Sequence, residues 1–262
     1  MPNTLPSVLK GLLEQLDGTE DTLFVDTESQ VESPWREFNP DLKKLNILDS
    51  HELAGMIGFG INSSTMAVTA QPDPQCRFIY LFGNTSLSAL NITRPMFAEI
   101  LTFHQVMPAY LEFVMAFGRQ DEPEDLKFAG FKKQVSLAPG ARLPEIPGLG
   151  RSGQQYQLCY NLKRISTMAD GKFSTIRQAA IHHQFDVVTG KTLWIATAGR
   201  RELQERYKEL TGKDADPRDK SFGSLIECLQ SSLAAHGMFC SWSAENWRWY
   251  IKSLENDLGR VV

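Results

Sequence analysis

The sequence predicts an α/β domain of the α+β type, in which helices flank a mixed, largely antiparallel sheet. Residues 155–198 contain three segments that alternate polar and apolar side chains, with turn signals between them. Other segments repeat apolar residues every three or four positions, as amphipathic helices do. The 262 residues are 42% apolar and 22% charged, which is ordinary for a chain with a sizeable buried core.

The N-terminal region combines one helical pattern with an irregular stretch. Residues 5–16 repeat leucine and valine at helical spacing, which predicts a helix that Gly18 ends. Residues 27–42 are polar and marked by proline, so we expect a loop there. A short strand at 46–48 should follow the loop.

Two short elements come next. Asp49 and Glu52 have the spacing of a capping box, which predicts a short helix that Gly58 and Gly60 end. Residues 77–82 are aromatic and β-branched and lie between turn-forming residues. This pattern predicts a strand.

A longer helical pattern begins after Thr93, which can cap it, and has Pro95 near its start. Pro108 must bend the helix or restart it, because proline removes a backbone donor. Residues 119–154 hold many charges, prolines and glycines. We expect them to form a long surface excursion with one short element near Phe128.

The strongest strand signal predicts a three-stranded antiparallel meander over Gln155–Thr197, with turns at 169–171 and 189–190. Helices should follow at 200–210, 222–235 and 244–258. Because apolar faces pack together, we expect one shared core cluster of six residues. Its expected members are Val106, Met107, Val114, Leu158, Tyr160 and Trp194.

Charge and hydropathy exclude several classes of protein. The net charge is −4 and no basic stripe occurs, which argues against nucleic-acid binding. Residues 95–118 are the most apolar stretch, but they include charged residues and a proline, so they predict a buried core helix. The first residues lack the pattern of a signal peptide. We therefore expect a cytoplasmic chain that inserts no segment into a membrane.

The cysteines indicate a reducing compartment. They are far apart and lack the C-x-x-C spacing of redox and zinc sites. We expect them to be reduced and buried. The four are Cys76, Cys159, Cys228 and Cys240.

No motif predicts an assembled catalytic site. Residues 148–153 match G-x-G-x-x-G, but they precede a strand and not a helix, unlike a dinucleotide-binding turn. His182 and His183 are adjacent, so on a strand they point to opposite faces and cannot clamp one metal ion. Cys159 lies between apolar neighbours, where a thiol is inert. A polar cleft that brings His104 or His183 beside Cys159 in space would favour an enzyme.

A short acidic run is the one candidate for a metal site. Carboxylates at this density can hold a hard divalent cation such as Mg²⁺ weakly, whereas a solvated loop is the plainer interpretation. No other cofactor is expected. The run consists of Asp121, Glu122, Glu124 and Asp125.

The C-terminal segment carries an unusual aromatic helix pattern. Ser243 can cap a helix over 244–258. One side of that helix is an aromatic and aliphatic stripe, which must pack on its own domain or meet a partner helix. The stripe comprises Trp247, Tyr250, Ile251, Leu254 and Leu258.

Four segments, from about residue 75 onward, resemble the soluble N-terminal domain of fungal CorA-like transporter proteins. The resemblance implies a cytoplasmic α/β domain followed by a stalk helix and two membrane helices, in subunits that form Mg²⁺-carrying pentamers. The domain would then span 1–240, and 241–262 would begin the stalk. The segments are FHQVMPAYLEFVMAFG (103–118), QLCYNLKRI (157–165), IRQAAIHHQFDVVTGKTLWIATAG (176–199) and WSAENWRWYIKSLE (242–255).

The sequence also departs from that family's pattern. The Gly-Met-Asn signature of the pore entrance is absent, and the nearest string is Gly55-Met56-Ile57. Neither membrane helix lies within the sequence up to Val262, so we expect no ion conduction by this chain itself. No pore or metal residue of the family carries over to it.

Three hypotheses remain. The first is a non-catalytic regulatory or assembly domain of the CorA-like kind, able to form a homo-oligomer. The second is an interaction module that offers the C-terminal aromatic helix to a partner. The third is an enzyme whose site forms only in the folded chain.

Overall fold

The computed structural model describes residues 14, 20–38, 42–58, 72–85, 87–119, 130–167 and 173–261. The strands are Ser33–Phe38 (β1), Leu42–Ile47 (β2), Cys76–Phe82 (β3), Phe131–Val135 (β4), Gln155–Thr167 (β5), Phe173–Asp186 (β6) and Thr192–Ala198 (β7). The α-helices are Glu20–Leu23 (α2), Ser50–Ile57 (α3), Arg94–Phe103 (α4), Tyr110–Val114 (α5), Glu202–Leu210 (α6), Leu225–Ala244 (α7) and Trp247–Val261 (α8). Short 3-10 turns lie at Glu28–Gln30 (η1), Pro147–Leu149 (η3) and Pro217–Asp219 (η4).

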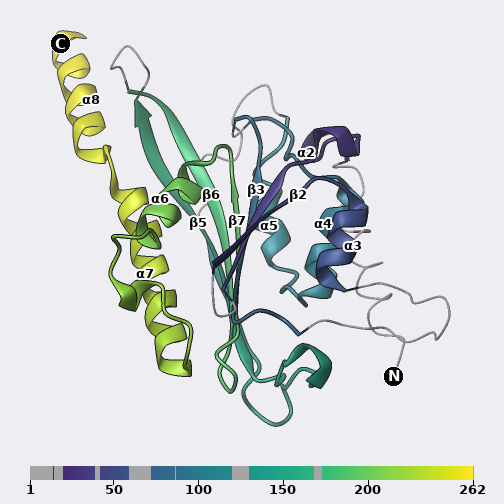
Figure 1. The fold of residues 1–262 in the computed structure, drawn as a ribbon. Coiled ribbons are helices and arrows are strands. Elements are labelled where there is room, and N and C mark those ends of the chain that lie inside the picture. Colours follow the sequence, from purple (N-terminus) through teal and green to yellow (C-terminus); the bar gives the residue numbers. More distant parts are fainter. Residues whose placement is uncertain are drawn as a thin grey trace.

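The strands form one seven-stranded sheet in the order β2-β1-β3-β7-β6-β5-β4. The β3–β7 pair is parallel, and the other neighbours are antiparallel. In Figure 1, α6 and α7 lie on one side of the sheet, and α3, α4 and α5 lie on the other. The predicted mixed, largely antiparallel sheet flanked by helices is therefore confirmed.

The predicted meander is confirmed as β5, β6 and β7. Its register places Cys159 opposite His182, and His183 opposite Trp194. Alternation along β6 sends His182 toward α5 and His183 toward α7, as the sequence predicts for adjacent strand residues. The strand predicted at 77–82 is β3.

The loop predicted over 27–42 is wrong in its second half, because β1 occupies Ser33–Phe38 and is buried along its whole length. The polar residues Arg36 and Glu37 suggested a loop, but each of them has a partner in the fold. Arg36 Nη1 donates to Thr211 Oγ1 at 3.2 Å, and Glu37 pairs with Arg77 at 2.7 Å. Satisfied polar groups can occupy a buried strand.

The predicted helix starts are mostly confirmed. Asp49 accepts from the Glu52 backbone at 2.7 Å, and Gly58 ends α3 with a left-handed φ of 73°. α4 ends at Phe103 and α5 restarts at Tyr110, so Pro108 does separate two helices. The short element expected near Phe128 is β4. The helix predicted over 5–16 lies outside the described residues, apart from position 14.

The predicted helix over 244–258 starts three residues later, at Trp247, and Ser243 does not cap it. Instead α7 continues through Ser243, whose hydroxyl donates to the Cys240 carbonyl at 2.9 Å. Apolar residues on successive turns keep α7 packed against the sheet as far as Trp242. This packing carries the helix past its predicted end at 235.

The core consists of two clusters on opposite sheet faces, which corrects the single cluster expected from the sequence. Val106, Met107 and Val114 pack with α3, α4 and α5, whereas Trp194 packs with α6 and α7. Leu158 and Tyr160 are only half-buried. The reason is the strand period, which sends neighbouring residues to different faces.

The cysteines are all free, as expected. Three of them are buried: Cys76 and Cys159 lie on strands of the sheet, and Cys228 lies on α7. Cys240 is the exception, because it lies on the solvent side of α7 and is exposed. The expectation that every cysteine is buried was therefore wrong for Cys240.

Candidate functional site

The junction between α7 and α8 is anchored to the sheet. Asn246 interrupts the helix with a left-handed φ of 68°, a conformation that asparagine tolerates better than most residues. Its Nδ2 donates to the Ile165 carbonyl at 3.0 Å. Trp247 Nε1 donates to the Ser243 carbonyl at 2.8 Å. These bonds fix where α8 leaves the domain.

Ion pairs strengthen the same junction. Glu245, between the two helices, lies 3.3 Å from Arg164 of β5 and also pairs with Arg206 of α6. The junction therefore ties three elements together through one carboxylate. This arrangement sets the direction in which α8 projects beyond the sheet in Figure 1.

The predicted stripe on α8 is covered only at its base. Trp247 and Tyr250 are half-buried, with their rings 6.4 Å apart. Ile251 and Leu254 are 52% and 50% exposed, and Leu258 is 68% exposed. The stripe thus runs from the parent domain into solvent.

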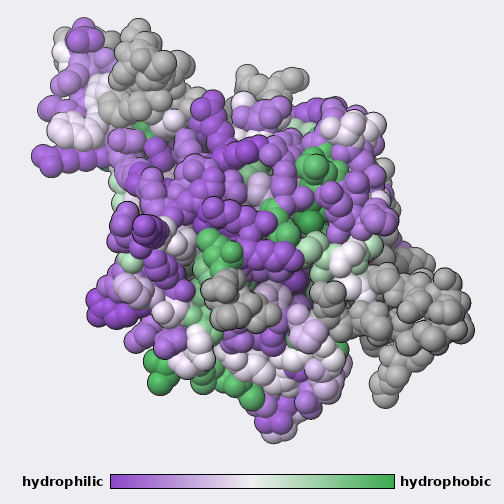
Figure 2. Space-filling model, in the orientation of Figure 1, coloured by the Kyte–Doolittle hydropathy of each residue, from purple (hydrophilic) through white to green (hydrophobic). Residues whose placement is uncertain are grey.

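A second exposed apolar surface, which the sequence reasoning missed, lies on the first half of α7. Figure 2 shows it as the green area at the lower left. The sequence pattern could have revealed this surface, because α7 carries apolar residues on more than one side, which is typical of a helix with two partners. Its exposed members are Leu225, Ile226, Leu229 and Leu233.

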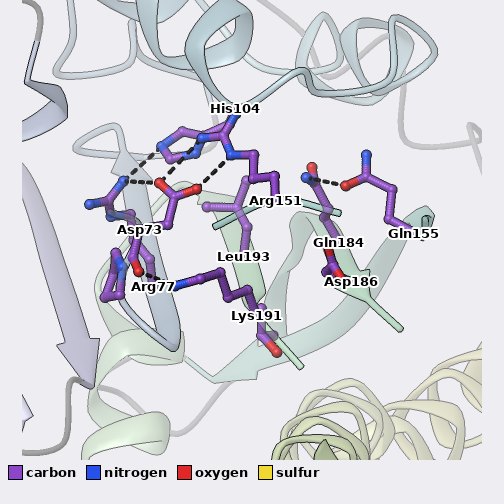
Figure 3. A pocket seen from close by; sticks show the side chains of 11 residues that line it. Asp73, Arg77, His104, Arg151, Gln155, Gln184, Asp186, Lys191 and Leu193 are labelled. Atoms are coloured by element: carbon purple, nitrogen blue, oxygen red, sulfur yellow. Dashed lines mark hydrogen bonds and ion pairs between the residues drawn. The ribbon is translucent and has the colours of Figure 1, made fainter. Parts of the chain in front are cut away.

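A buried ionic cluster lies at the other end of the sheet (Figure 3). Arg151 forms a bidentate pair with Asp73, with contacts of 2.5 and 3.2 Å. Arg77 lies 3.7 Å from the same carboxylate, and Lys191 donates to the Asp73 backbone carbonyl. The cluster lines a pocket of about 30 Å³, which is room for ordered water and not for a substrate.

His104 in this cluster cannot serve as a base. Its Nε2 lies 3.3 Å from Arg77 Nη1, and a guanidinium only donates, so Nε2 must accept that hydrogen bond. Burial and the charges of Arg77 and Arg151 hold the pKa of His104 well below its ordinary value. The ring is therefore neutral, with its basic lone pair already occupied.

A second chain of hydrogen bonds links the sheet to α7. The Tyr160 hydroxyl lies 2.7 Å from His236 Nδ1, and His236 Nε2 lies 3.0 Å from His183 Nδ1. His183 also stacks on Trp194 with ring centroids 3.9 Å apart. Burial lowers the pKa of His236 to about 4, so this chain is neutral and structural at neutral pH.

Cys159 is not placed beside His104 or His183, the two histidines considered from the sequence; the strand register sets it opposite His182. Cys159 faces the α4–α5 side of the sheet, away from His183. Burial is the main cause that raises the Cys159 pKa to about 12, so its thiol stays protonated. His104 belongs to the ionic cluster, where its Nε2 contacts Arg77.

A comparison with protein families matches the CorA-like transporters over residues 1–262. The chain belongs to the CorA-like family. No curated protein matches it. The family match extends to the first 70 residues, where the resemblance read from the sequence was weakest.

In this CorA-like chain, no helix within the described ranges has the length and apolar character needed to cross a membrane. Those ranges also contain no group of three or more His, Cys, Asp or Glu side chains that could hold a metal ion. The acidic run at 121–125 lies outside the described residues. The glycine-rich stretch forms η3 and leads into β5, not into a helix.

Proposed function

We propose that this chain is a non-catalytic cytoplasmic domain that regulates or assembles a CorA-like divalent-cation transporter of fungal type. The observation that carries the proposal is the apolar stripe of α8. The parent domain covers only the base of this stripe, and the rest lies exposed on a helix that projects beyond the sheet. A helix in this position suits the base of a stalk, and residues 241–262 would supply it. The proposed partner of the stripe is the α8 of a second copy.

Energetics support a partner for this helix. Full burial of a leucine or isoleucine side chain contributes about 1.5–3 kcal/mol. Ile251 and Leu254 are about half exposed, so roughly half of that contribution is still available from each. Equivalent helices that pack side by side would recover it from both copies.

The non-catalytic part of the proposal rests on the buried polar groups. His104 Nε2, His183 Nδ1 and both ring nitrogens of His236 contact neighbouring side chains, and Cys159 faces the other side of the sheet from His183 and His236. These contacts stabilise the fold and leave no activated nucleophile among the described residues.

A free-standing interaction module is the second candidate, and the exposed surface of α7 favours it. That surface could hold a different protein while α8 remains unpaired. The two candidates differ in whether the purified chain associates with itself.

Two glutamates on the α8 stripe will abolish self-association. Light scattering across a dilution series should give a concentration-dependent mass for the native chain and a constant monomer mass for Ile251→Glu/Leu254→Glu. Because both positions are exposed in the single chain, the variant should lose no more than about 0.5 kcal/mol of stability.

The matched control is Lys252→Gln/Asn256→Glu, which makes the same change in net charge on the other side of α8. This control should associate like the native chain. If the native chain is monomeric at every concentration, the assembly role is contradicted. If both double variants dissociate equally, net charge and not the stripe governs association.

A further inference from the structure

Three arginines stand in a row across neighbouring strands, on the face covered by α6 and α7. The register of β5 and β6 pairs Arg164 directly with Arg177. The register of β6 and β7 pairs Ala179 with Ala198, which places Arg200, two residues past the end of β7, beside Arg177. Like charges directly opposite one another destabilise a sheet, so this row requires negative charge nearby.

The carboxylates at this place neutralise only part of the row. Glu202 and Glu245 lie 3.2 and 3.3 Å from Arg164 Nη1. Within the described parts of the chain, neither Arg177 nor Arg200 forms an ion pair. Burial and the charge of Arg200 lower the pKa of Arg177 from its ordinary value, the Glu202 carboxylate opposes this, and Arg164 lowers it further. The row therefore holds three guanidinium groups against two carboxylates, and one of those carboxylates, Glu245, is shared with Arg206.

Buried hydrogen-bond donors converge on the same place. The Nε atoms of Arg164 and Arg177 and the Nε1 of Trp242 are buried without an acceptor, although Trp242 is only 3% exposed. Arg177 and Trp242 line one pocket, which Arg164 does not line, and buried polar groups are nearly always paired, so these two orphaned donors indicate a missing acceptor there. An anionic oxygen can accept several such bonds.

Arg177 and Trp242 border a small pocket beside the α7–α8 junction. Arg177, Gly199, Arg200 and Trp242 line it, and its volume is about 10 Å³. That volume holds one oxygen-sized atom, so the rest of an oxyanion would lie at the mouth, where Arg200 is exposed. Glu202 also lines the pocket, but its carboxylate is engaged by Arg164.

We propose that this pocket binds the phosphate group of a small molecule, with Arg177 and Arg200 as its charge partners and Trp242 Nε1 as a neutral donor. Two unpaired guanidinium groups match the charge of about −1.5 to −2 on a phosphate monoester at neutral pH. A single carboxylate would neutralise only one of them. The planar fork of arginine also suits two-point binding of phosphate oxygens.

Titration calorimetry of the full chain at fixed ionic strength tests the site. The probes are inorganic phosphate, glycerol 3-phosphate and adenosine monophosphate, with acetate as the carboxylate control. We expect phosphate or its esters to bind at least tenfold more tightly than acetate. Binding of the esters alone still supports the site and shows that its ligand is an ester, whereas binding of none of the three overturns it.

Substitutions in the arginine row test whether these arginines bind the phosphate. Arg177→Gln and Arg200→Gln should each weaken phosphate binding at least tenfold, which corresponds to about 1.4 kcal/mol. The control Arg142→Gln removes an exposed arginine elsewhere and should leave binding unchanged. Without phosphate, Arg177→Gln should unfold at the same or a higher temperature, because like-charge repulsion is removed. Equal losses in all three variants would overturn the assignment.

Discussion

Trp194→Ala will destabilise the domain by about 3–5 kcal/mol, which is the usual cost of removing a large, fully buried aromatic side chain. Trp194 is 1% exposed and lies at the centre of the sheet face covered by α7. Its ring stacks on His183 at 3.9 Å and on Phe78 at 5.3 Å, and it meets Phe239 of α7 at 5.5 Å. The substitution would leave a cavity that three elements border.

Urea unfolding monitored by circular dichroism measures this loss. Trp249→Ala is the matched control, because Trp249 is 60% exposed on α8 and its loss should cost no more than about 0.5 kcal/mol. A cost below about 1 kcal/mol for Trp194→Ala would contradict its place in the core.

Mild acid will destabilise the domain because four of its five histidines are buried or half-buried and neutral. Burial lowers the pKa of His182 to about 3 and that of His236 to about 4. The pKa values of His104 and His183 are also well below their ordinary value. Each histidine regains a pKa of about 6.5 on unfolding, so the unfolded chain binds more protons.

The sign of the effect follows from this difference in bound protons. A lowered histidine pKa contributes stability above pH 6.5, and that contribution falls as the pH drops from 6.5 toward the folded value. Between pH 7.5 and 5.5, each of the four should contribute a loss on the order of 1 kcal/mol, so that together they cost several kcal/mol. Carboxylates titrate mainly below this window.

Urea midpoints measured at pH 7.5, 6.5 and 5.5 give the pH dependence. His236→Gln should remove about one quarter of the loss, whereas His51→Gln, which changes an exposed histidine, should remove none. A free energy of unfolding that stays constant across this window would mean that the buried histidines titrate with the same pKa in the folded and unfolded chain, which would contradict the lowered values.

The parts of the fold that follow from local pattern were predictable. Alternation and turn residues identified β5, β6 and β7, and Asp49 with Glu52 identified the start of α3. β1 was missed because Arg36 and Glu37 read as loop residues. Their partners, Thr211 and Arg77, are distant in sequence, so nothing local shows that they can be buried.

The same distinction applies to the candidate sites. The α8 stripe depends on helical spacing alone, and its side chains were named from the sequence. The arginine row depends on the strand register, which the sequence reasoning did not assign. The ionic cluster joins Asp73 to Arg151 and Lys191 across long separations, so only the folded chain brings them together.

Cysteine cross-linking along α8 tests the central claim most directly. In a Cys240→Ser background, which removes the exposed native thiol, Leu254→Cys places a thiol on the stripe and Asn256→Cys places one on the other side of the helix. If the stripe is where two copies meet, mild oxidation will give a disulfide-linked dimer with Leu254→Cys and little or none with Asn256→Cys. Equal cross-linking at the two positions, or none at either, would contradict an assembly role for α8.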